Sequence, residues 1–264
     1  MSAAALPTLP EFSLKDKVAV VTGGGRGLGL EMSRALAESG AHVAIMFVSS
    51  EKTHDTAAQI AKDFNVTCKA YKADIIDPVA VKQAVDQIYK DFGAIDVFVA
   101  NAGVSIGGNT EDYDLNDWKK TMDINVNGVF YSIQAASKYM LEKGKGSVII
   151  TSSISGHVAN RPQAQCAYNT SKGATTLMTK ALATEWATRG IRVNAICPGY
   201  MRTDLLDITL SNNPGLEEQW NVFTPMGRIG EARELRGAVV FLASDASTYV
   251  TGIELFVDGG YTCV

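Results

Sequence analysis

Several features that would place this chain in other classes of protein are missing from its sequence. It has no dense run of lysine or arginine, and 24 basic residues stand against 28 acidic ones, a net charge of −4. Nucleic acids are bound by clustered positive charge, so the composition argues against a nucleic-acid partner. No apolar stretch approaches the ~20 residues that a membrane-spanning helix needs, so no membrane segment is expected.

Cysteine is scarce and scattered. The four cysteines lie far apart and form no Cys-x-x-Cys pair: Cys68, Cys166, Cys197 and Cys263. Neither a disulfide framework nor a metal site is predicted, and free thiols are typical of a reducing compartment. Residues 1–13 contain no Lys or Arg and no long apolar core, which indicates neither a signal peptide nor a transit peptide. We therefore expect a cytoplasmic protein with a flexible tail over residues 1–13.

The chain does contain a regular alternation of apolar runs and helical segments. Strands are expected where β-branched and apolar residues cluster, at residues 17–22, 42–48, 67–73, 95–100, 146–152, 191–196 and 252–258. Helices are expected at residues 30–39, 52–64, 79–92, 118–141, 170–189 and 231–244. The helix at 118–141 is interrupted in pattern at Asn125 and Gly128, and residues 203–221 look polar and irregular.

This order of elements predicts the fold class. Strands that alternate with helices indicate an α/β protein with a Rossmann-like, doubly wound, mainly parallel seven-stranded sheet and helices on both faces. A chain of 264 residues is within the range of a single domain, which we place at residues 14–264.

A glycine-rich turn follows the first predicted strand, with the pattern Thr22-Gly23-x-x-x-Gly27-Leu28-Gly29. Glycines between a strand and a helix let a pyrophosphate approach the backbone and the helix N-terminus. The spacing departs from the G-x-G-x-x-G fingerprint. Its place at the first strand–helix junction nevertheless predicts a dinucleotide site.

The end of the second predicted strand indicates which dinucleotide binds. An NAD site usually has an acidic residue there, but this strand runs through Phe47 into Ser49 and Ser50. Arg26 and the two serines could bind a 2′-phosphate, which predicts NADP(H) in preference to NAD(H). Glu51 lies about 20 residues after the last glycine of the turn and is the rival reading, because it could hold the ribose of NAD.

Tyr168 and Lys172 are four residues apart in a predicted helical region, so their side chains point the same way. An ammonium near a phenol stabilises the phenolate and lowers the tyrosine pKa from ~10. A phenol tuned in this way can donate a proton to a carbonyl oxygen or accept one.

These motifs together resemble the single-domain short-chain dehydrogenase/reductase family. Five blocks match it in order: Thr22-Gly23 to Gly29, Asn101-Ala102-Gly103, Asn125-Val126-Asn127-Gly128, Ser153 with Tyr168 and Lys172, and Pro198-Gly199 with Thr203. The segments 152–172 and 244–262 are more specifically similar to fungal polyol dehydrogenases and ketose reductases.

The resemblance implies a role for each matched residue. Tyr168 would be the acid or base, Lys172 would lower its pKa and hold the nicotinamide ribose, and Ser153 would bind the carbonyl oxygen. Asn125 would fix a water that relays protons to Lys172. Further cofactor contacts are implied at Asp74, Ile75, Asn101, Ala102, Gly103, Pro198, Gly199, Met201 and Thr203. A homo-oligomer, a tetramer, is also implied.

Two assignments stay open from the sequence. Counting back from Tyr168 by the commoner family spacing would select Ser155 in place of Ser153, and Ser155 could also contact substrate. We prefer Ser153, because in the family the working serine lies shortly before a small residue, which matches Ser153 before Gly156 in the run Thr151-Ser152-Ser153-Ile154-Ser155-Gly156. A slightly extended loop at 161–165 would explain the longer gap to Tyr168. His157 lies near the site, but Tyr168 already supplies the proton.

The expected activity is the NADP(H)-dependent interconversion of a ketose or small ketone and an alcohol. Substrate choice is expected to reside in the loop 204–221. A reductase of a secondary-metabolite or acyl-chain ketone is one alternative. A nucleotide-binding scaffold without catalysis is another, although an intact set of Asn125, Ser153, Tyr168 and Lys172 speaks against it.

Overall fold

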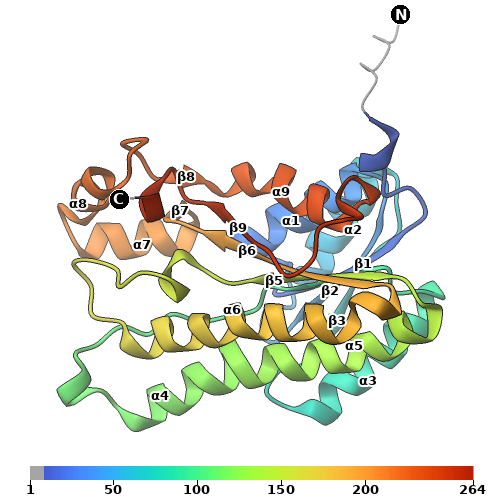
Figure 1. The fold of residues 1–264 in the computed structure, drawn as a ribbon, viewed down its shortest axis with the longest axis horizontal. Helices are drawn as coiled ribbons and strands as arrows, with labels where there is room; N and C mark the ends of the chain where they lie inside the picture. Colours follow the sequence, from blue (N-terminus) through green and yellow to red (C-terminus); the bar gives the residue numbers. More distant parts are fainter. Residues whose placement is uncertain (1–8, 264) are drawn as a thin grey trace, which may run out of the picture.

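The computed structural model describes residues 9–263, and its centre is a seven-stranded parallel sheet (Figure 1). Its order is β3-β2-β1-β4-β5-β6-β9, with every neighbouring pair parallel. The strands are β1 (Val18–Thr22), β2 (His42–Phe47), β3 (Cys68–Lys72), β4 (Val97–Ala100), β5 (Gly146–Thr151), β6 (Ile191–Pro198) and β9 (Glu254–Val257). The order reverses between β1 and β4, the point where doubly wound sheets bind ligands at the carboxyl ends of their strands. The predicted fold class is confirmed.

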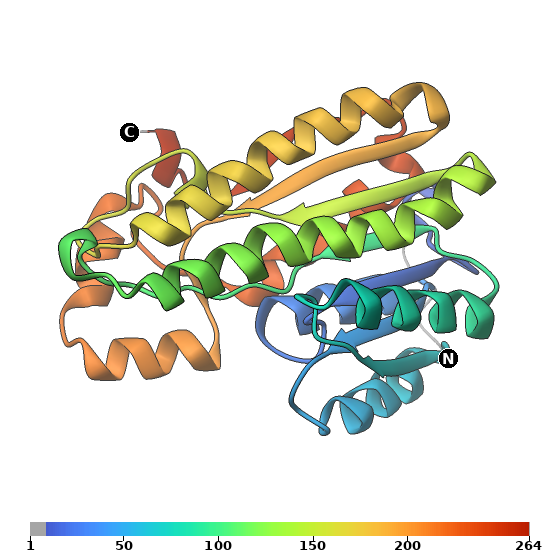
Figure 2. The same cartoon turned by 90° about the horizontal axis from the view of Figure 1, so that it is seen from below.

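Helices cover both faces of the sheet. One face carries α1 (Gly27–Glu38), α2 (Thr53–Phe64) and α9 (Arg236–Ala243), and the other carries α3 (Pro78–Phe92), α5 (Val129–Lys143) and α6 (Cys166–Trp186) (Figures 1 and 2). Successive residues of a strand point to opposite faces. In β1, Val20 belongs to the core beneath α3 and α5, whereas Ala19 and Val21 belong to the core beneath α1 and α9. Because both faces are covered, the strands are apolar throughout.

The long helix before β5 is interrupted as the sequence predicts. It consists of α4 (Leu115–Met122), a π-helical segment at Asp123–Gly128, and α5. A π-turn in a helix changes the direction of the side chains that it carries and is frequent at functional sites. Gly128 is required here because a Cβ would lie 2.8 Å from the Cδ1 of Ile75.

The region expected to be irregular is helical, so that part of the prediction is wrong. It contains α7 (Asp204–Asn212) and α8 (Leu216–Phe223), and its flanks pair as the short strands β7 (Met201–Arg202) and β8 (Gly230–Glu231). No residue of α7 is buried and Trp220 is the buried residue of α8. Helices with so few buried positions show little hydrophobic periodicity, which is why their pattern was weak.

Two boundaries also differ from expectation. The helix expected at 170–189 begins earlier, at Cys166, so Tyr168 lies within α6 and not before it. Residues 1–8 of the expected tail lie outside the described residues, whereas Pro10–Phe12 form a 3-10 turn. The Phe12 ring lies 6.5 Å from that of Phe241 on α9, which fixes this turn to the domain. All four cysteines are free thiols.

Candidate active site

Tyr168 and Lys172 lie one turn apart on α6, near the carboxyl end of β5. The Lys172 Nζ lies 5.6 Å from the centroid of the Tyr168 ring and donates to the carbonyl oxygen of Thr151 at 2.7 Å. Only 5% of Lys172 is exposed. Burial lowers the pKa of the Lys172 ammonium to about 8, because a charged group is disfavoured away from water.

The pKa of Tyr168 does not move in the expected direction. Burial raises the pKa of its phenol, and the hydrogen bond with Ser153 only partly opposes this effect. Lys172 was expected to lower the pKa, but its ammonium is directed to the Thr151 carbonyl. The Tyr168 phenol is therefore protonated at neutral pH, the form that donates a proton.

The structure places Ser153, and not Ser155, against the phenol. The Ser153 side chain, and not that of Ser155, acts to lower the pKa of the Tyr168 phenol, and the Ser153 Oγ accepts from the Ser155 backbone N–H at 3.1 Å. The Ser155 hydroxyl turns instead to Gln165, whose Nε2 donates to it at 3.2 Å. The two serines point in different directions because Ser153 is the extended N-cap of the 3-10 turn Ile154–Gly156, whereas Ser155 lies within that turn.

Asn125 is fully buried in the π-helical segment beside these residues. Its Oδ1 accepts from the Val104 N–H at 2.8 Å, and its Nδ2 donates to the Val104 carbonyl at 2.8 Å and to the Ser171 Oγ at 3.0 Å. A Cβ on Gly103 would lie 3.2 Å from the Asn125 Oδ1 and 3.7 Å from the Lys172 Nζ. The side chains of Asn125 and Lys172 therefore both lie beside the backbone of Gly103.

The glycine turn forms a close-fitting cradle between β1 and α1. Gly23 has a φ of +65°, which side-chain-bearing residues rarely adopt, and a Cβ on Gly29 would lie 2.3 Å from the Gly23 carbonyl oxygen. The block after β4 is tied to the same place, because the Asn101 and Ala102 N–H groups donate to the Thr22 Oγ1 at 2.9 and 3.0 Å. The glycines at the N-terminus of α1 therefore leave the backbone accessible to close approach, which suits a pyrophosphate.

The groups proposed for the 2′-phosphate are exposed around the end of β2. Thr22 of β1 pairs with Met46 of β2, so the glycine turn and the segment after Phe47 both lie at the carboxyl ends of the strands. Arg26, Ser49 and Ser50 are all exposed there. Glu51 is engaged elsewhere: its Oε1 accepts from the Lys72 Nζ at 2.5 Å, and that pairing lowers the pKa of the Glu51 carboxyl.

The remaining predicted cofactor residues also follow the carboxyl ends of strands. Asp74 and Ile75 follow β3, and Ile75 is buried against Gly128. Beyond Pro198 and Gly199, Met201 is in β7, and the Thr203 Oγ1 accepts from the Leu206 N–H at the start of α7. A Cβ on Gly27 would lie 3.6 Å from the Thr203 Cγ2, so this segment reaches the glycine turn.

His157 is directed toward strand β9. Its Nε2 pairs with the Glu254 carboxylate on β9, and the Lys180 Nζ of α6 lies 2.6 Å from the Glu254 Oε1. The His157 ring also packs on Phe256 at 4.9 Å. These contacts give His157 a structural place behind the serine turn.

Several polar residues near the site were not assigned a function from the sequence. Gln163 and Gln165 precede Tyr168, and their side chains connect Ser155 to Tyr200 and to Trp220 of α8. The two glutamines, spaced two residues apart before Tyr168, were the only sequence feature that could have indicated these hydrogen bonds. Their partners are too distant in sequence for that signal to identify them.

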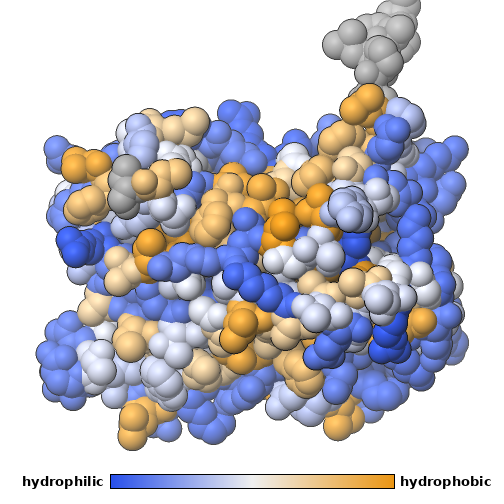
Figure 3. Space-filling view, in the orientation of Figure 1, coloured by the Kyte–Doolittle hydropathy of each residue, from blue (hydrophilic) through white to orange (hydrophobic). Residues whose placement is uncertain are grey.

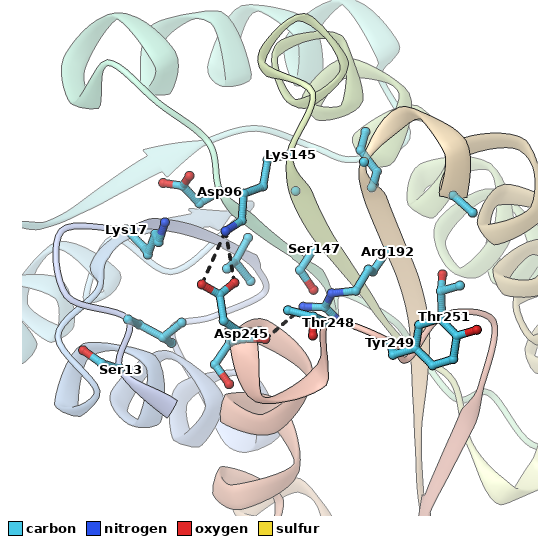
Figure 4. A pocket seen from close by; sticks show the side chains of 18 residues that line it. Ser13, Lys17, Asp96, Lys145, Ser147, Arg192, Asp245, Thr248, Tyr249 and Thr251 are labelled. Atoms are coloured by element: carbon cyan, nitrogen blue, oxygen red, sulfur yellow. Dashed lines mark hydrogen bonds and ion pairs between the residues drawn. The ribbon is translucent and has the colours of Figure 1, made fainter. Parts of the chain in front are cut away.

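A separate cavity of about 500 Å³ opens at the amino ends of the strands, opposite the ends that carry the site residues (Figure 4). It is lined by residues at the amino ends of β4, β5 and β6, among them Asp96, Ser147 and Arg192. The Lys145 Nζ lies 3.1 Å from Asp245 there, and the Arg192 guanidinium donates to backbone carbonyls. This cavity is distinct from the site around Tyr168.

No helix among residues 9–263 is both long and apolar enough to cross a membrane.

Comparison with known proteins agrees with this geometry. A family model described as enoyl-(acyl carrier protein) reductase matches residues 23–262. A sorbose reductase of Candida albicans is 44% identical over 97% of this chain and 92% of its own, and an NADP-dependent mannitol dehydrogenase of Hypocrea jecorina is 42% identical over 95% and 94%. The crystal structure of an NADPH-dependent 3-quinuclidinone reductase from Rhodotorula rubra superposes with a TM-score of 0.91 at 37% identity and covers 100% of both chains. With its glycine cradle, its Ser153–Tyr168–Lys172 set and these relatives, the chain belongs to the short-chain dehydrogenase/reductase family.

Proposed function

We propose that this protein is an NADP(H)-dependent oxidoreductase that interconverts a ketone and a secondary alcohol, with ketoses and polyols as its substrate class. The observation that carries this function is the buried Tyr168 phenol, whose pKa is raised by burial, an effect that the Ser153 side chain opposes, with the Lys172 Nζ 5.6 Å from its ring. The substrate class is supported by the relatives named sorbose reductase and NADP-dependent mannitol dehydrogenase.

The residues present fit the cofactor. The cradle formed by Gly23 and Gly29 leaves no room for a Cβ, and the N-terminus of α1 favours negative charge. Arg26, Ser49 and Ser50 would hold the 2′-phosphate, and Asp74, Ile75 and residues 101–103 would hold the adenosine. Pro198, Gly199, Met201 and Thr203 would cover the nicotinamide. NADP(H) supplies or accepts the hydride when it is bound.

The chain's own residues handle the proton and the developing charge. The hydroxyls of Ser153 and Tyr168 would both donate to the substrate carbonyl oxygen, which stabilises negative charge as it forms there. Tyr168 would transfer its proton to that oxygen in reduction and take it back in oxidation. The Lys172 ammonium would stabilise the phenolate left behind, and Asn125 would fix a water that returns a proton to Lys172.

We also propose that residues 14–264 act as a single catalytic domain, with residues 204–221 as the substrate loop, in a cytoplasmic homotetramer. Strand β9 forms one edge of the sheet and is half-buried, and an apolar area extends over the side of the molecule where α9 and β9 lie (Figure 3). An open strand edge with apolar surroundings is a common site of self-association.

A rate panel tests the proposed function. Initial rates with fructose, sorbose, xylulose and a diketone, each with NADPH and NADH, should show the highest kcat/KM for a ketose with NADPH. A preference for the diketone would favour the secondary-metabolite alternative. Absence of turnover with every ketone, despite cofactor binding, would favour the scaffold alternative.

A further inference from the structure

A continuous line of hydrogen bonds, made of side chains as far as Ser155 and completed by the Ser155 backbone N–H, joins α8 to Ser153. It starts at Trp220, passes through Gln163, Tyr200, Asn160 and Gln165, and ends at Ser155 and Ser153. Its members come from three separate parts of the chain: the segment before α6, the end of β6 and the helix α8.

The outer half of this line holds α8 in place. The Trp220 Nε1 donates to the Gln163 Oε1 at 3.1 Å, and the Gln163 Nε2 donates to the Tyr200 hydroxyl at 2.8 Å. The rings of Trp220 and Tyr200 stack with centroids 4.0 Å apart and planes 8° from parallel. Trp220 is only 4% exposed, although α8 is otherwise mostly exposed. Gln163 therefore connects the two halves of the stacked pair.

The inner half reaches the catalytic residues. The Asn160 Nδ2 donates to the Tyr200 hydroxyl at 3.1 Å, and the Gln165 Nε2 donates to the Asn160 Oδ1 at 2.8 Å and to the Ser155 Oγ at 3.2 Å. The Ser155 N–H in turn donates to Ser153. Tyr200 is also held from the C-terminal segment, because its ring meets that of Tyr261 edge-on at 5.5 Å.

This line leads to Ser155 and Ser153, and it contains amide groups that could pair with hydroxyls. Within residues 9–263, the Gln165 Oε1 receives no hydrogen bond. Each side-chain amide has two N–H donors, and Gln163 and Asn160 each use one of theirs in this line. A site with such groups favours a substrate whose hydroxyls satisfy them over an analogue that leaves them unpaired.

We propose that Gln163 is a positioning residue that fixes Trp220 and Tyr200 and thereby orders this line for the hydroxyl groups of the substrate. Gln163 takes no part in proton transfer. It acts on the binding of a hydroxylated ketone and only weakly on the catalytic step once substrate is bound. The identity of the substrate rests on the proposed function, whereas the anchoring of α8 does not.

The test compares Gln163→Leu with the unmodified protein on two six-carbon ketones, fructose and 2-hexanone, which differ in their hydroxyls. We expect KM for fructose to rise about tenfold, equivalent to ~1.4 kcal/mol, with kcat within about threefold. KM for 2-hexanone should also stay within about threefold. Trp220 should gain exposure to water, so that tryptophan emission shifts to longer wavelength; comparison with Trp220→Phe assigns the shift. Gln87→Leu is the matched control, because the Gln87 Nε2 donates to Asp91 at 2.7 Å on the distant helix α3.

Each outcome decides the proposal. An unchanged KM for fructose, an equal rise of KM for both ketones, or a parallel fall of kcat for both would overturn it. If Gln163→Leu does not fold, Trp220→Phe decides, since it removes the indole donor and keeps a stacking ring; it should raise KM for fructose and not for 2-hexanone. If the unmodified protein reduces 2-hexanone but no ketose, the proposed substrate class fails, while the emission shift still reports on the anchoring of α8.

Discussion

Burial acts in opposite directions on the pKa values of Tyr168 and Lys172, which lie one turn apart on α6. It raises the pKa of the Tyr168 phenol and lowers the pKa of the Lys172 ammonium to about 8. Both shifts favour the neutral form, as expected for groups removed from water. The proton that the reaction needs is therefore held on the tyrosine, and the lysine carries a charge that is costly to keep.

Tyr168→Phe should lower kcat/KM by at least about a thousandfold, within the ~10²–10⁴-fold range of general acid catalysis combined with loss of a donor to the oxyanion. The affinity for NADPH should change little, which fluorescence titration can measure. Tyr139→Phe is the control, because the Tyr139 hydroxyl of α5 donates to Asp86 of α3 at 2.7 Å, a contact that involves no residue of the proposed site. Near-normal turnover by a folded Tyr168→Phe protein would contradict the assignment.

Lys172→Met should abolish activity and stabilise the fold at neutral pH. The folded pKa of about 8 lies below the ordinary 10.5, so between those values the unfolded chain binds more protons and stability rises with pH. Below pH 8 the buried ammonium costs up to roughly 3 kcal/mol, a cost that methionine removes. Denaturant unfolding at pH 7 and pH 10 should show a gain that is larger at pH 7.

Exposed lysines provide the comparison for that experiment. Lys82 forms a surface pair with Asp86 and is 64% exposed, so Lys82→Met should change the free energy of unfolding by less than about 1 kcal/mol at both pH values. A destabilised Lys172→Met protein at pH 7 would show that the bond to the Thr151 carbonyl outweighs the cost of burial.

The elements show how far the sequence predicts this structure. The seven strands follow from their apolar, β-branched runs, and the interruption at Asn125 follows from a polar residue within a helical pattern. The helices α7 and α8 do not follow, because they bury little more than Trp220. The contacts of Gln163 with Tyr200 and Trp220 do not follow either, because they join residues 37 and 57 positions apart.

The junction after β2 is where we propose that the cofactor preference is set. Phe47 is 7% exposed and contacts His54, and no acid ends the strand. A charge-assisted hydrogen bond contributes ~1.5–3 kcal/mol, so NADPH should be preferred over NADH about tenfold to a hundredfold. Phe47→Asp should shift the ratio of kcat/KM values toward NADH, because the carboxylate would bind the ribose hydroxyls and repel a 2′-phosphate.

Two further variants separate the groups at this junction. Arg26→Ala should raise KM for NADPH and leave KM for NADH unchanged. Glu51→Gln should not alter the ratio, since Glu51 pairs with Lys72. A loss of NADH activity in Glu51→Gln would instead support the rival role of Glu51 at the ribose.

For the molecule as a whole, the open edge at β9 favours assembly. Light scattering at micromolar concentration should give roughly four times the 28.2 kDa of one chain. Ile253 lies just before β9 and is 37% exposed, so Ile253→Glu should lower that mass by placing charge at the edge. Val79→Glu, at an exposed position on α3, is the control. A monomer in the unmodified protein would exclude the assembly.

The cavity at the amino ends of the strands has a consequence for the search for inhibitors. Strand β6 contributes Arg192 to that cavity and ends at Pro198, one of the residues proposed to cover the nicotinamide. At ~3.3 Å per residue the two ends are roughly 20 Å apart. Compounds that fill this cavity would therefore compete with neither cofactor nor ketone. Such compounds would lower the maximal rate without raising KM for either, which a plot of rate against each substrate would reveal.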